Sequence, residues 1–222
     1  MAEWTELKAA DGHALKAWRV APAGTPKGAV VVVMEIFGVN HHIRDVAERF
    51  AREGYLAIAP AMFDRYSRDF DVGYGPDDMA KAFAFLPKLN MDHAVLDIDA
   101  ARKAVAGAGK TGVVGYCFGG TAAWLSATRL KFDAAVCYYG GNIAGFASEK
   151  PHCPVIMHFG SKDAHIPMDK VEAIKKAQPN VPVYVYDADH GFSCDERASF
   201  DKTAHELAWS RTTKFFAENL HG

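Results

Sequence analysis

The sequence predicts an α/β fold in which a mainly parallel central sheet carries helices on both faces. Short apolar runs rich in β-branched residues recur along the chain and alternate with segments whose apolar residues have helical spacing. Such alternation is typical of right-handed β-α-β units. The chain has 222 residues, half of them hydrophobic, which is enough to bury one large core. We therefore expect a single domain over residues 1–222.

Each element is placed from its own local pattern. An N-terminal antiparallel hairpin is expected at one edge of the sheet, with strands at 5–8 and 14–20 around the turn Asp11-Gly12. The remaining strands are expected at 29–34, 55–59, 111–114, 134–139, 155–159 and 183–186. Helices are expected over 43–50, 95–105, 121–128 and 198–220. The longest irregular stretch, 64–78, is a candidate pocket rim in which Arg65, Tyr66 and Arg68 are expected to be solvated.

Composition excludes several classes of partner. Lys and Arg total 25 against 27 Asp and Glu, a net charge of -2, so no positive field favours nucleic acid. No apolar run approaches the roughly 20 residues of a membrane helix, and the first residues do not form a signal peptide, so we expect a cytoplasmic protein. The cysteines Cys117, Cys137, Cys153 and Cys194 lie far apart, with no zinc-type spacing, so we expect reduced thiols, no metal and no cofactor. The oligomeric state is not specified.

A cysteine occupies a glycine-rich turn after the strand expected at 111–114. Residues 115–120 read G-Y-C-F-G-G and precede a helical stretch, the G-x-C-x-G pattern of a nucleophile elbow. Glycines at 115 and 119 remove the side chains that would collide with the crossing backbone. The helix N-terminus that follows favours the thiolate of Cys117. The alternative is an inert buried cysteine beside a flexible turn.

An acid and a histidine follow two later strands. Asp163 comes just after the strand at 155–159, and His190 just after the strand at 183–186. The order Cys117, Asp163, His190 is that of the nucleophile, acid and base of α/β-hydrolases, all on loops at the carboxyl ends of strands. Other acids remain as competitors for the orienting role: Asp169, Asp187 and Asp189.

The strand at 29–34 leads into E-I-F-G-V-N at 35–40. An α/β-hydrolase takes one oxyanion donor from this position and the other from the residue after the nucleophile, so we expect the N–H groups of Ile36 and Phe118 to form the oxyanion hole. Glu35 ends a buried strand, where a carboxylate needs a partner. Either Arg44 or a nearby histidine forms a salt bridge with it, or it lies near the thiol and helps to control its proton.

These motifs together resemble the dienelactone hydrolase (carboxymethylenebutenolidase) family of cysteine α/β-hydrolases. The similarity covers nearly the whole chain and rests on M-E-I-F-G-V-N at 34–40, G-Y-C-F-G-G at 115–120, Y-Y-G at 138–140, the Asp163 loop and H-G-F at 190–192. The resemblance implies hydrolysis of a small lactone through a thioester, with Cys117, Asp163 and His190 as the triad. It also implies that Glu35 holds the thiol at rest and takes its proton when substrate arrives.

The basic residues that bind a substrate carboxylate in this family are not matched position for position. Lys81 and Arg197 stand in the corresponding neighbourhoods and are the expected substrate-binding residues, although a lysine does not reproduce the bidentate geometry of an arginine. The substrate is therefore a small lactone or ester, with or without a carboxylate. A carboxylesterase or thioesterase of the same fold is the alternative within enzymes, and a ligand-binding or redox-sensing protein without catalysis is the alternative outside them.

Some other residues near these motifs have less specific expectations. His41 and His42 are expected at a solvated helix start or pocket rim, and Cys137 in the core. Cys194 is expected to line the pocket or to be a partly exposed thiol. The apolar group Phe83, Phe85 and Leu86 is expected to form a packing face or a pocket wall.

Overall fold

The computed structural model describes residues 1–221. Its strands are β1 (Ala2–Lys8), β2 (Ala14–Val20), β3 (Ala29–Val33), β4 (Leu56–Pro60), β5 (Thr111–Tyr116), β6 (Ala134–Tyr138), β7 (Val155–Gly160) and β8 (Val183–Tyr186). They form one sheet in the order β1-β2-β4-β3-β5-β6-β7-β8. Strands β3 to β8 pair in parallel, and β1 and β2 add an antiparallel hairpin beside β4. The predicted sheet and edge hairpin are confirmed.

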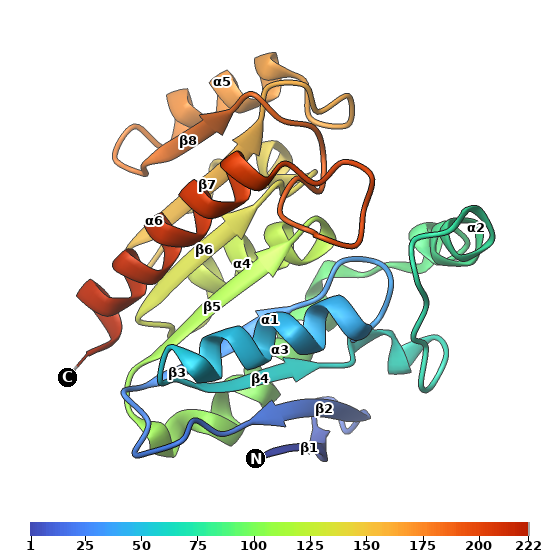
Figure 1. The fold of residues 1–222 in the computed structure, drawn as a ribbon, viewed down its shortest axis with the longest axis vertical. Helices are drawn as coiled ribbons and strands as arrows, with labels where there is room; N and C mark the ends of the chain where they lie inside the picture. The colour runs from blue at the N-terminus through green and yellow to red at the C-terminus, as the bar shows by residue number, and fades with distance from the viewer. Residues whose placement is uncertain (222) are drawn as a thin grey trace.

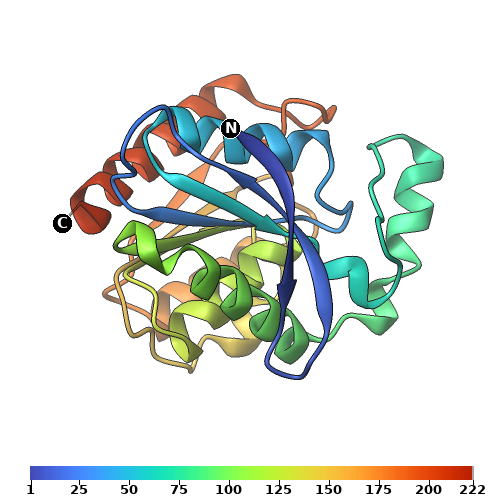
Figure 2. The same cartoon turned by 90° about the horizontal axis from the view of Figure 1, so that it is seen from below.

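Helices cover both faces of the sheet. One face carries α1 (His41–Arg52) and α6 (Lys202–Leu220), and the other carries α3 (Met91–Val105), α4 (Phe118–Arg129) and α5 (Met168–Ala177) (Figures 1 and 2). The short helix α2 (Pro76–Phe83) stands away from the sheet, beyond the carboxyl end of β4 (Figures 1 and 2). Strands β3 to β7 are buried along their full length, which explains why their sequences are continuous apolar runs without alternation.

The last helix begins later than its apolar spacing suggests. Asp201 is the N-cap of α6, and its side chain accepts a hydrogen bond from the Ala204 N–H at 2.8 Å. This bond satisfies one of the unpaired donors of the first turn, so the helix begins at Lys202 and not at 198. Residues 198–200 remain in the loop that precedes it.

The stretch 64–78 is less irregular than predicted, and Arg65 is not part of a solvated rim. A 3-10 turn covers Met62–Arg65, and α2 starts at Pro76. The Arg65 side chain is largely buried and forms salt bridges with Asp97 on α3 and Asp11 in the hairpin turn. Burial opposes its charge, but these two carboxylates raise the pKa of Arg65 overall. The residue therefore fastens the segment to the body of the protein.

Within residues 1–221, no helix combines the length and the apolar character that crossing a bilayer requires.

Candidate active site

The turn between β5 and α4 holds Cys117 in a strained conformation. Its φ and ψ are 56° and -115°, a region that residues other than glycine rarely occupy. A Cβ added to Gly115 would lie 1.8 Å from the carbonyl oxygen of Gly119, and one added to Gly119 would lie 2.4 Å from that of Val33. Both positions therefore require glycine. The predicted elbow is present, with the sulfur partly exposed at the first turn of α4.

Two backbone N–H groups beside Cys117 have no acceptor among the described residues. They are those of Ile36, just after β3, and Phe118, the first residue of α4. Both residues line the same cavity as Cys117. Unpaired N–H groups at such a place are suited to binding a negatively charged oxygen.

His190 and Asp163 meet through a short hydrogen bond. Nδ1 of His190 lies 2.6 Å from Oδ2 of Asp163, and the other carboxylate oxygen accepts from the N–H groups of His165 and Ile166. Burial opposes the charged imidazole, but the interactions with Asp163 and with Cys117 outweigh it and raise the pKa of His190 to about 10. Burial likewise opposes the charge of Asp163, but the bond to His190 keeps the pKa of that carboxyl below its usual value.

None of the competing acids is hydrogen-bonded to the His190 imidazole among the described residues. Asp187 is exposed and pairs with Lys162, and Asp189 accepts a hydrogen bond from the backbone N–H of His190. Asp169 lies in the first turn of α5. Asp163 is therefore the acid that the fold brings to the imidazole of His190.

Glu35 is buried just after β3 and has two partners. Its Oε1 accepts from the guanidinium of Arg197 at 3.1 Å, and its Oε2 accepts from the hydroxyl of Tyr74 at 2.9 Å. Burial opposes the charge of Arg197, but the neighbouring Glu35 carboxylate raises its pKa overall. Burial is also the main reason that the pKa of Tyr74 is raised. Arg44, the partner considered from sequence, instead binds Asp71 and the carbonyl of Val39.

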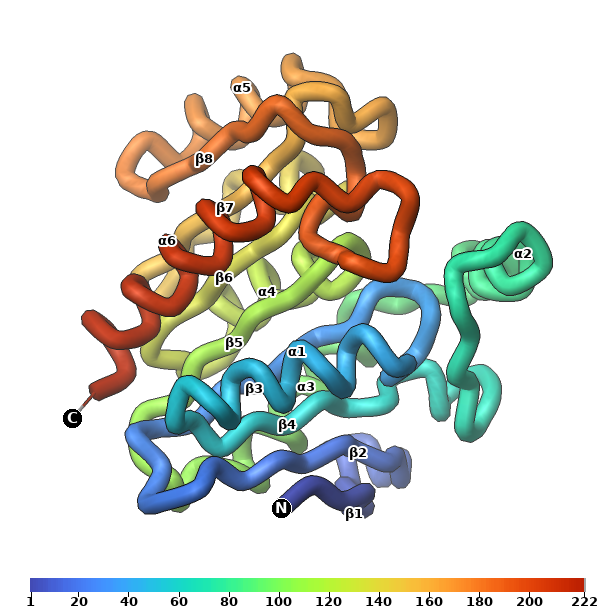
Figure 3. Tube along the Cα trace, in the orientation of Figure 1, coloured from blue at the N-terminus to red at the C-terminus, as the bar shows by residue number. Residues whose placement is uncertain are grey.

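The loop between β8 and α6 folds back over the start of α1 (Figure 3). Cys194 in this loop and His42 on α1 lie close to Glu35. Both side chains are fully buried, so the expectation of a solvated His42 and of an exposed or pocket-lining Cys194 is wrong. Burial opposes the charge of His42, but Asp195 and Cys194 raise the pKa of its imidazole to about 10. His41 is exposed and bonds to Glu196, and these contacts together hold the loop on α1.

The three side chains of Glu35, His42 and Cys194 each offer one metal-ligating atom, and these atoms lie within 4.8 Å of one another. They are the group of described residues best placed to hold a metal ion. The Glu35 carboxylate is already bonded to Arg197 and Tyr74, and the positive guanidinium at 3.1 Å opposes a further cation. The group is therefore an ionic and hydrogen-bonded network rather than an open metal centre.

A cavity of about 300 Å³ contains the sulfur, the imidazole and the two unpaired N–H groups. It is lined by Ile36, Phe37, Met79, Phe83, Leu86, Leu89, Met91, Cys117, Phe118, Thr121, Gly141, Asn142, His165, His190 and Arg197. Of the two basic residues expected to bind substrate, Arg197 lines this cavity. Lys81 does not: its side chain is exposed, and its ammonium group bonds to Asp78.

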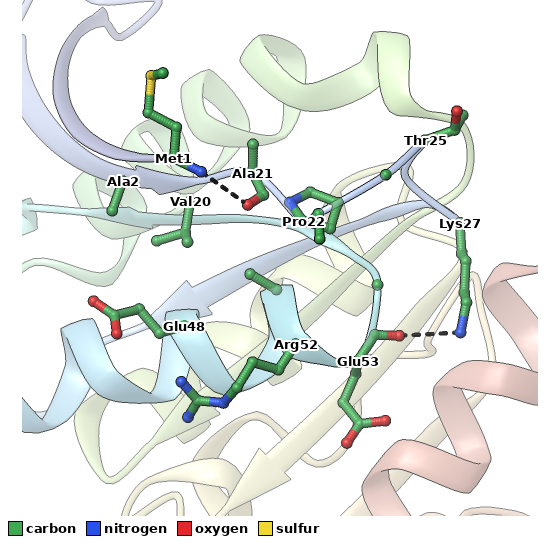
Figure 4. A pocket seen from close by; sticks show the side chains of 14 residues that line it. Met1, Ala2, Val20, Ala21, Pro22, Thr25, Lys27, Glu48, Arg52 and Glu53 are labelled. Atoms are coloured by element: carbon green, nitrogen blue, oxygen red, sulfur yellow. Dashed lines mark hydrogen bonds between the residues drawn. The ribbon is translucent and has the colours of Figure 1, made fainter.

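A larger hollow, of about 740 Å³, lies at the other end of the sheet, around the N-terminus (Figure 4). Its lining includes Met1, Pro22, Lys27, Glu48 and Arg52, with no cysteine or histidine. Lys27 donates to the backbone carbonyl of Glu53 across it (Figure 4). Its lining has no cysteine or serine nucleophile beside a histidine, so the smaller cavity is the candidate active site.

Sequence reasoning did not identify Tyr74 as a partner of Glu35, nor Met79, Leu89 and Met91 as part of the cavity lining. Tyr74 lies in an irregular stretch, and nothing in its local pattern shows that it reaches Glu35. Phe83 and Leu86 form the pocket wall, which was one of the two expectations for them, whereas Phe85 packs against Phe63 and Phe70. Nothing in the local sequence around Met79 or Met91 indicates that these residues line a cavity.

Comparison with known proteins identifies the family. The family model described as "Dienelactone hydrolase family" matches residues 15–220. The carboxymethylenebutenolidase of Pseudomonas putida is 30% identical over 230 residues, which cover 98% of this chain and 97% of that protein. The crystal structure of the "Putative Dienelactone Hydrolase" of Klebsiella pneumoniae superposes with a TM-score of 0.85 at 30% identity, over 98% of this chain and 99% of that chain.

A further structure shares the fold at lower identity. The dienelactone hydrolase-like promiscuous phosphotriesterase from metagenomic libraries has a TM-score of 0.79 at 23% identity, with 100% of this chain and 99% of that chain covered. Family model, sequence relatives and structural neighbours agree over nearly the full length of the chain. The chain therefore belongs to the dienelactone hydrolase family, whose fold is that of the α/β-hydrolases.

Proposed function

We propose that this protein is a cysteine-dependent hydrolase of small lactones or esters that acts through a thioester intermediate. The observation that carries the proposal is the position of Cys117 at a strained elbow, in one cavity with a His190 imidazole that Asp163 orients at 2.6 Å. A nucleophile, a base and an orienting acid in this arrangement are the requirements of acyl transfer.

In the form of the site that attacks substrate, the sulfur is a thiolate beside the imidazolium of His190. His190 keeps its proton through the neutral range because its pKa is about 10, and the negative charges of Asp163 and Cys117 are what raise that pKa against the effect of burial. Arg197 and Glu35 form a second pair of opposite charges beside it. Each of the two cations, His190 and Arg197, therefore has at least one anionic partner.

Acylation begins when the thiolate attacks the carbonyl carbon of the substrate. The carbonyl π electrons move to oxygen, and the oxyanion accepts hydrogen bonds from the N–H groups of Ile36 and Phe118. As the tetrahedral intermediate collapses, the bond from carbon to the ring or alcohol oxygen breaks, and the imidazolium of His190 gives its proton to that oxygen. A lactone leaves its hydroxyl tethered to the thioester, whereas an ester releases an alcohol.

Deacylation needs a base, which the acylation step itself produces. Once the sulfur is a thioester it carries no charge, so one of the causes that raise the pKa of His190 has gone. The neutral imidazole then accepts a proton from water, whose oxygen attacks the thioester carbonyl. Collapse of this second intermediate breaks the carbon–sulfur bond, releases the carboxylic acid and restores the ion pair.

Glu35 is a buried carboxylate in the network of charged and polar groups beside the cavity. Its carboxylate is next in sequence to the Ile36 donor and is fixed by Arg197 and Tyr74, so it lies within the same charge network as the sulfur. This position supports a role in controlling the proton of the Cys117 thiol before substrate binds. The pH dependence of Cys117 alkylation in Glu35→Gln tests that role.

Hydrolysis by purified protein tests the proposal directly. The wild type is expected to hydrolyse p-nitrophenyl acetate and a dienelactone, while Cys117→Ala loses at least about 10³-fold in kcat/KM, the scale for loss of a nucleophile. Cys117→Ser reports whether sulfur itself is needed, and Cys153→Ala removes a different thiol as the matched control. Equal activity of wild type and Cys117→Ala would show that the hydrolase mechanism is wrong. Stoichiometric labelling by iodoacetamide, lost only in the Cys117 variants, would place the reactive thiol.

A further inference from the structure

His42, at the start of α1, is a fully buried histidine that the proposed mechanism does not use. Its Nδ1 lies 3.3 Å from Oδ1 of Asp195, in the loop before α6. Its Nε2 is buried and has no hydrogen-bond partner among the described residues. A ring nitrogen of His42, a carboxylate oxygen of Glu35 and the sulfur of Cys194 lie within 4.8 Å of one another. A buried polar atom without a partner costs free energy, which points to a role for this histidine beyond packing.

Charged groups alternate in sign between α1 and the cavity. Asp195 lies between His42 and Arg49, whose Nη2 is 2.6 Å from Oδ2 of that carboxylate. Glu35 lies between His42 and Arg197, whose guanidinium donates to it at 3.1 Å. Because Asp195 already has the guanidinium of Arg49, the charge of His42 is available to Glu35. Each of the two carboxylates therefore has two cationic neighbours.

The groups packed against His42 favour its protonated form. Asp195 and Cys194 face it from the loop before α6, and Glu35 faces it from the segment after β3. Burial opposes the charge of the ring, but these three groups raise the pKa of His42 to about 10. The other titratable or charged groups around it are the buried phenols of Tyr74 and Tyr116, the Arg49 guanidinium that shares Asp195, and His205 on α6. His42 therefore carries a positive charge in the neutral range.

Arg197 keeps donors that its pair with Glu35 does not use. A guanidinium has several N–H donors, and the hydrogen bond to Oε1 of Glu35 uses one nitrogen, Nη1. The residue also lines the cavity that contains Cys117. A negatively charged group of a substrate in this cavity would share the guanidinium with Glu35, and the two negative charges would repel each other. A second cation beside Glu35 reduces that repulsion.

From this alternation of charges and the unpartnered nitrogen, we infer that His42 is a positioning residue of the hydrolase site. Its imidazolium holds the Glu35 carboxylate in its charged form, so that Arg197 can also bind a negatively charged group of the substrate. His42 does not line the cavity, so it acts through Glu35 and Arg197. The inference rests on the proposed function, because it concerns how the same site accepts a carboxylate-bearing lactone or ester.

Two alkylating reagents that differ by one charge test the inference at Cys117. Iodoacetate and iodoacetamide both form a carbon–sulfur bond with the thiolate and expel iodide, but iodoacetate is an anion. The ratio of their rate constants at Cys117, followed by peptide mass spectrometry at pH 7.5, is expected to fall about fivefold in His42→Gln. His205→Gln is the matched control, because His205 contacts the same loop through Ser193 but burial lowers its pKa, so no charge is removed. An unchanged ratio in His42→Gln, or an equal fall in the control, overturns the inference.

A double-mutant cycle shows whether His42 acts through Glu35. In a Glu35→Gln background, adding His42→Gln is expected to change the ratio less than about twofold, because the carboxylate that connects His42 to Arg197 is gone. A fivefold fall that persists in this background would mean that His42 acts on the anion directly, and the assigned role would be wrong.

Asp195→Asn tests the same charge without removing the buried ring. The Asp195 side chain is 40% exposed, so the variant is expected to fold. Without this carboxylate the pKa of His42 falls, so between pH 6 and pH 9 the iodoacetate to iodoacetamide ratio is expected to drop about threefold more than in the wild type. Loss of an anion with the His42 proton retained would instead raise the ratio at every pH, and that result contradicts the inference. NMR of the His42 ring, assigned by its absence in His42→Gln, checks the charge directly: a neutral ring at pH 8 in the wild type overturns the inference.

Hydrolysis and alkylation together separate this inference from the mechanism. If hydrolysis of p-nitrophenyl acetate requires Cys117 but the alkylation ratio is the same in wild type and His42→Gln, the hydrolase proposal stands and the role of His42 is wrong. If the ratio falls as expected but Cys117→Ala hydrolyses the ester as fast as the wild type, the role of His42 in anion binding stands and the mechanism is wrong.

Discussion

Two buried carboxylates whose partners line the cavity, Asp163 and Glu35, differ in their surroundings. Asp163 accepts two backbone N–H groups and one imidazole, so its charge is held in place and its pKa is lowered. Glu35 instead depends on a guanidinium and a phenol. The partners of Asp163 are backbone groups of its own loop and a side chain that follows β8. Glu35 instead joins segments that are distant in sequence. Substituting Glu35 therefore disturbs both the charge of the cavity and the packing of two loops.

Glu35→Gln is expected to destabilise the protein by about 3–5 kcal/mol, because it leaves the Arg197 guanidinium buried without a counter-charge. Urea unfolding measures this. Glu6→Gln is the control: Glu6 is exposed and pairs with Arg68 at the surface, so its loss is expected to cost less than about 1 kcal/mol. Similar losses in the two variants would contradict the assignment of a buried pair.

The same variant tests the role of Glu35 toward the thiol. Arg197 interacts with both Glu35 and Cys117, so loss of the Glu35 charge is expected to change the pH dependence of iodoacetamide alkylation of Cys117, measured as rate constants from pH 5 to 10. An alkylation profile identical to that of the wild type would remove Glu35 from control of the thiol while leaving its pairing with Arg197 intact.

Sequence reasoning succeeds at the residue scale where chemistry follows from position on a strand end. Cys117, Asp163 and His190 each follow a buried strand, and parallel strands bring their carboxyl ends to one edge, so their meeting is predictable. The partner of Glu35 was not predictable in the same way. Whether Arg197 or Arg44 reaches it depends on how the loop before α6 folds back, and no periodicity encodes that path.

Elements were predicted well where apolar runs are long and less well at their ends. The strands from β3 to β8 all lie within one or two residues of the expected ranges. For β3 to β7 this is because burial on both faces imposes an apolar run. Helix α2 was missed, since it is short and has one buried residue, Ala82, so it has no apolar stripe facing the core. Its start is fixed by Pro76 in the first turn and not by packing.

Close backbone contacts at the elbow between β5 and α4 leave no room for a side chain at Gly119. Gly119→Ala is expected to destabilise the protein by more than about 3 kcal/mol or to prevent folding, since the new Cβ would meet the backbone of β3 at 2.4 Å. Gly107→Ala is the matched control, because a Cβ there has no neighbour within 4 Å and φ is ordinary. Thermal unfolding of both proteins measures the difference, and equal melting temperatures would contradict the steric account.

At the scale of the whole molecule, charged contacts hold the loop before α6 against α1 and against the segment after β3. Asp195 pairs with His42 and Arg49 on α1, and Arg197 pairs with Glu35 after β3. Hydrogen bonding to His42 is the main reason that the pKa of Asp195 is lowered. The Asp195 carboxyl and the His42 imidazole change charge with pH, so the attachment of this loop depends on pH.

Stability is expected to be greatest between about pH 4 and pH 6.5 and to fall on both sides. The carboxyls of Asp163 and Asp195 have pKa values below their usual value of 3.8, so their stabilisation is complete above that pH and is lost as pH falls. His190 and His42 have pKa values of about 10 against a usual 6.5, so theirs is complete below pH 6.5 and is lost as pH rises toward 10. Urea midpoints from pH 3 to 10 measure both limbs.

Asp163→Asn isolates the part that belongs to the candidate site. Without the carboxylate the pKa of His190 falls, so the loss of stability relative to wild type is expected to be largest near pH 5–6 and to shrink as pH approaches 10. Asp187→Asn removes the same charge from a nearby loop, where the carboxylate is exposed and bonded to Lys162, and is expected to leave the pH profile unchanged. If the deficit of Asp163→Asn were instead constant across the range, the Asp163–His190 pair would be stabilising the fold through packing alone, and the imidazolium would not be the charged state on which the site depends.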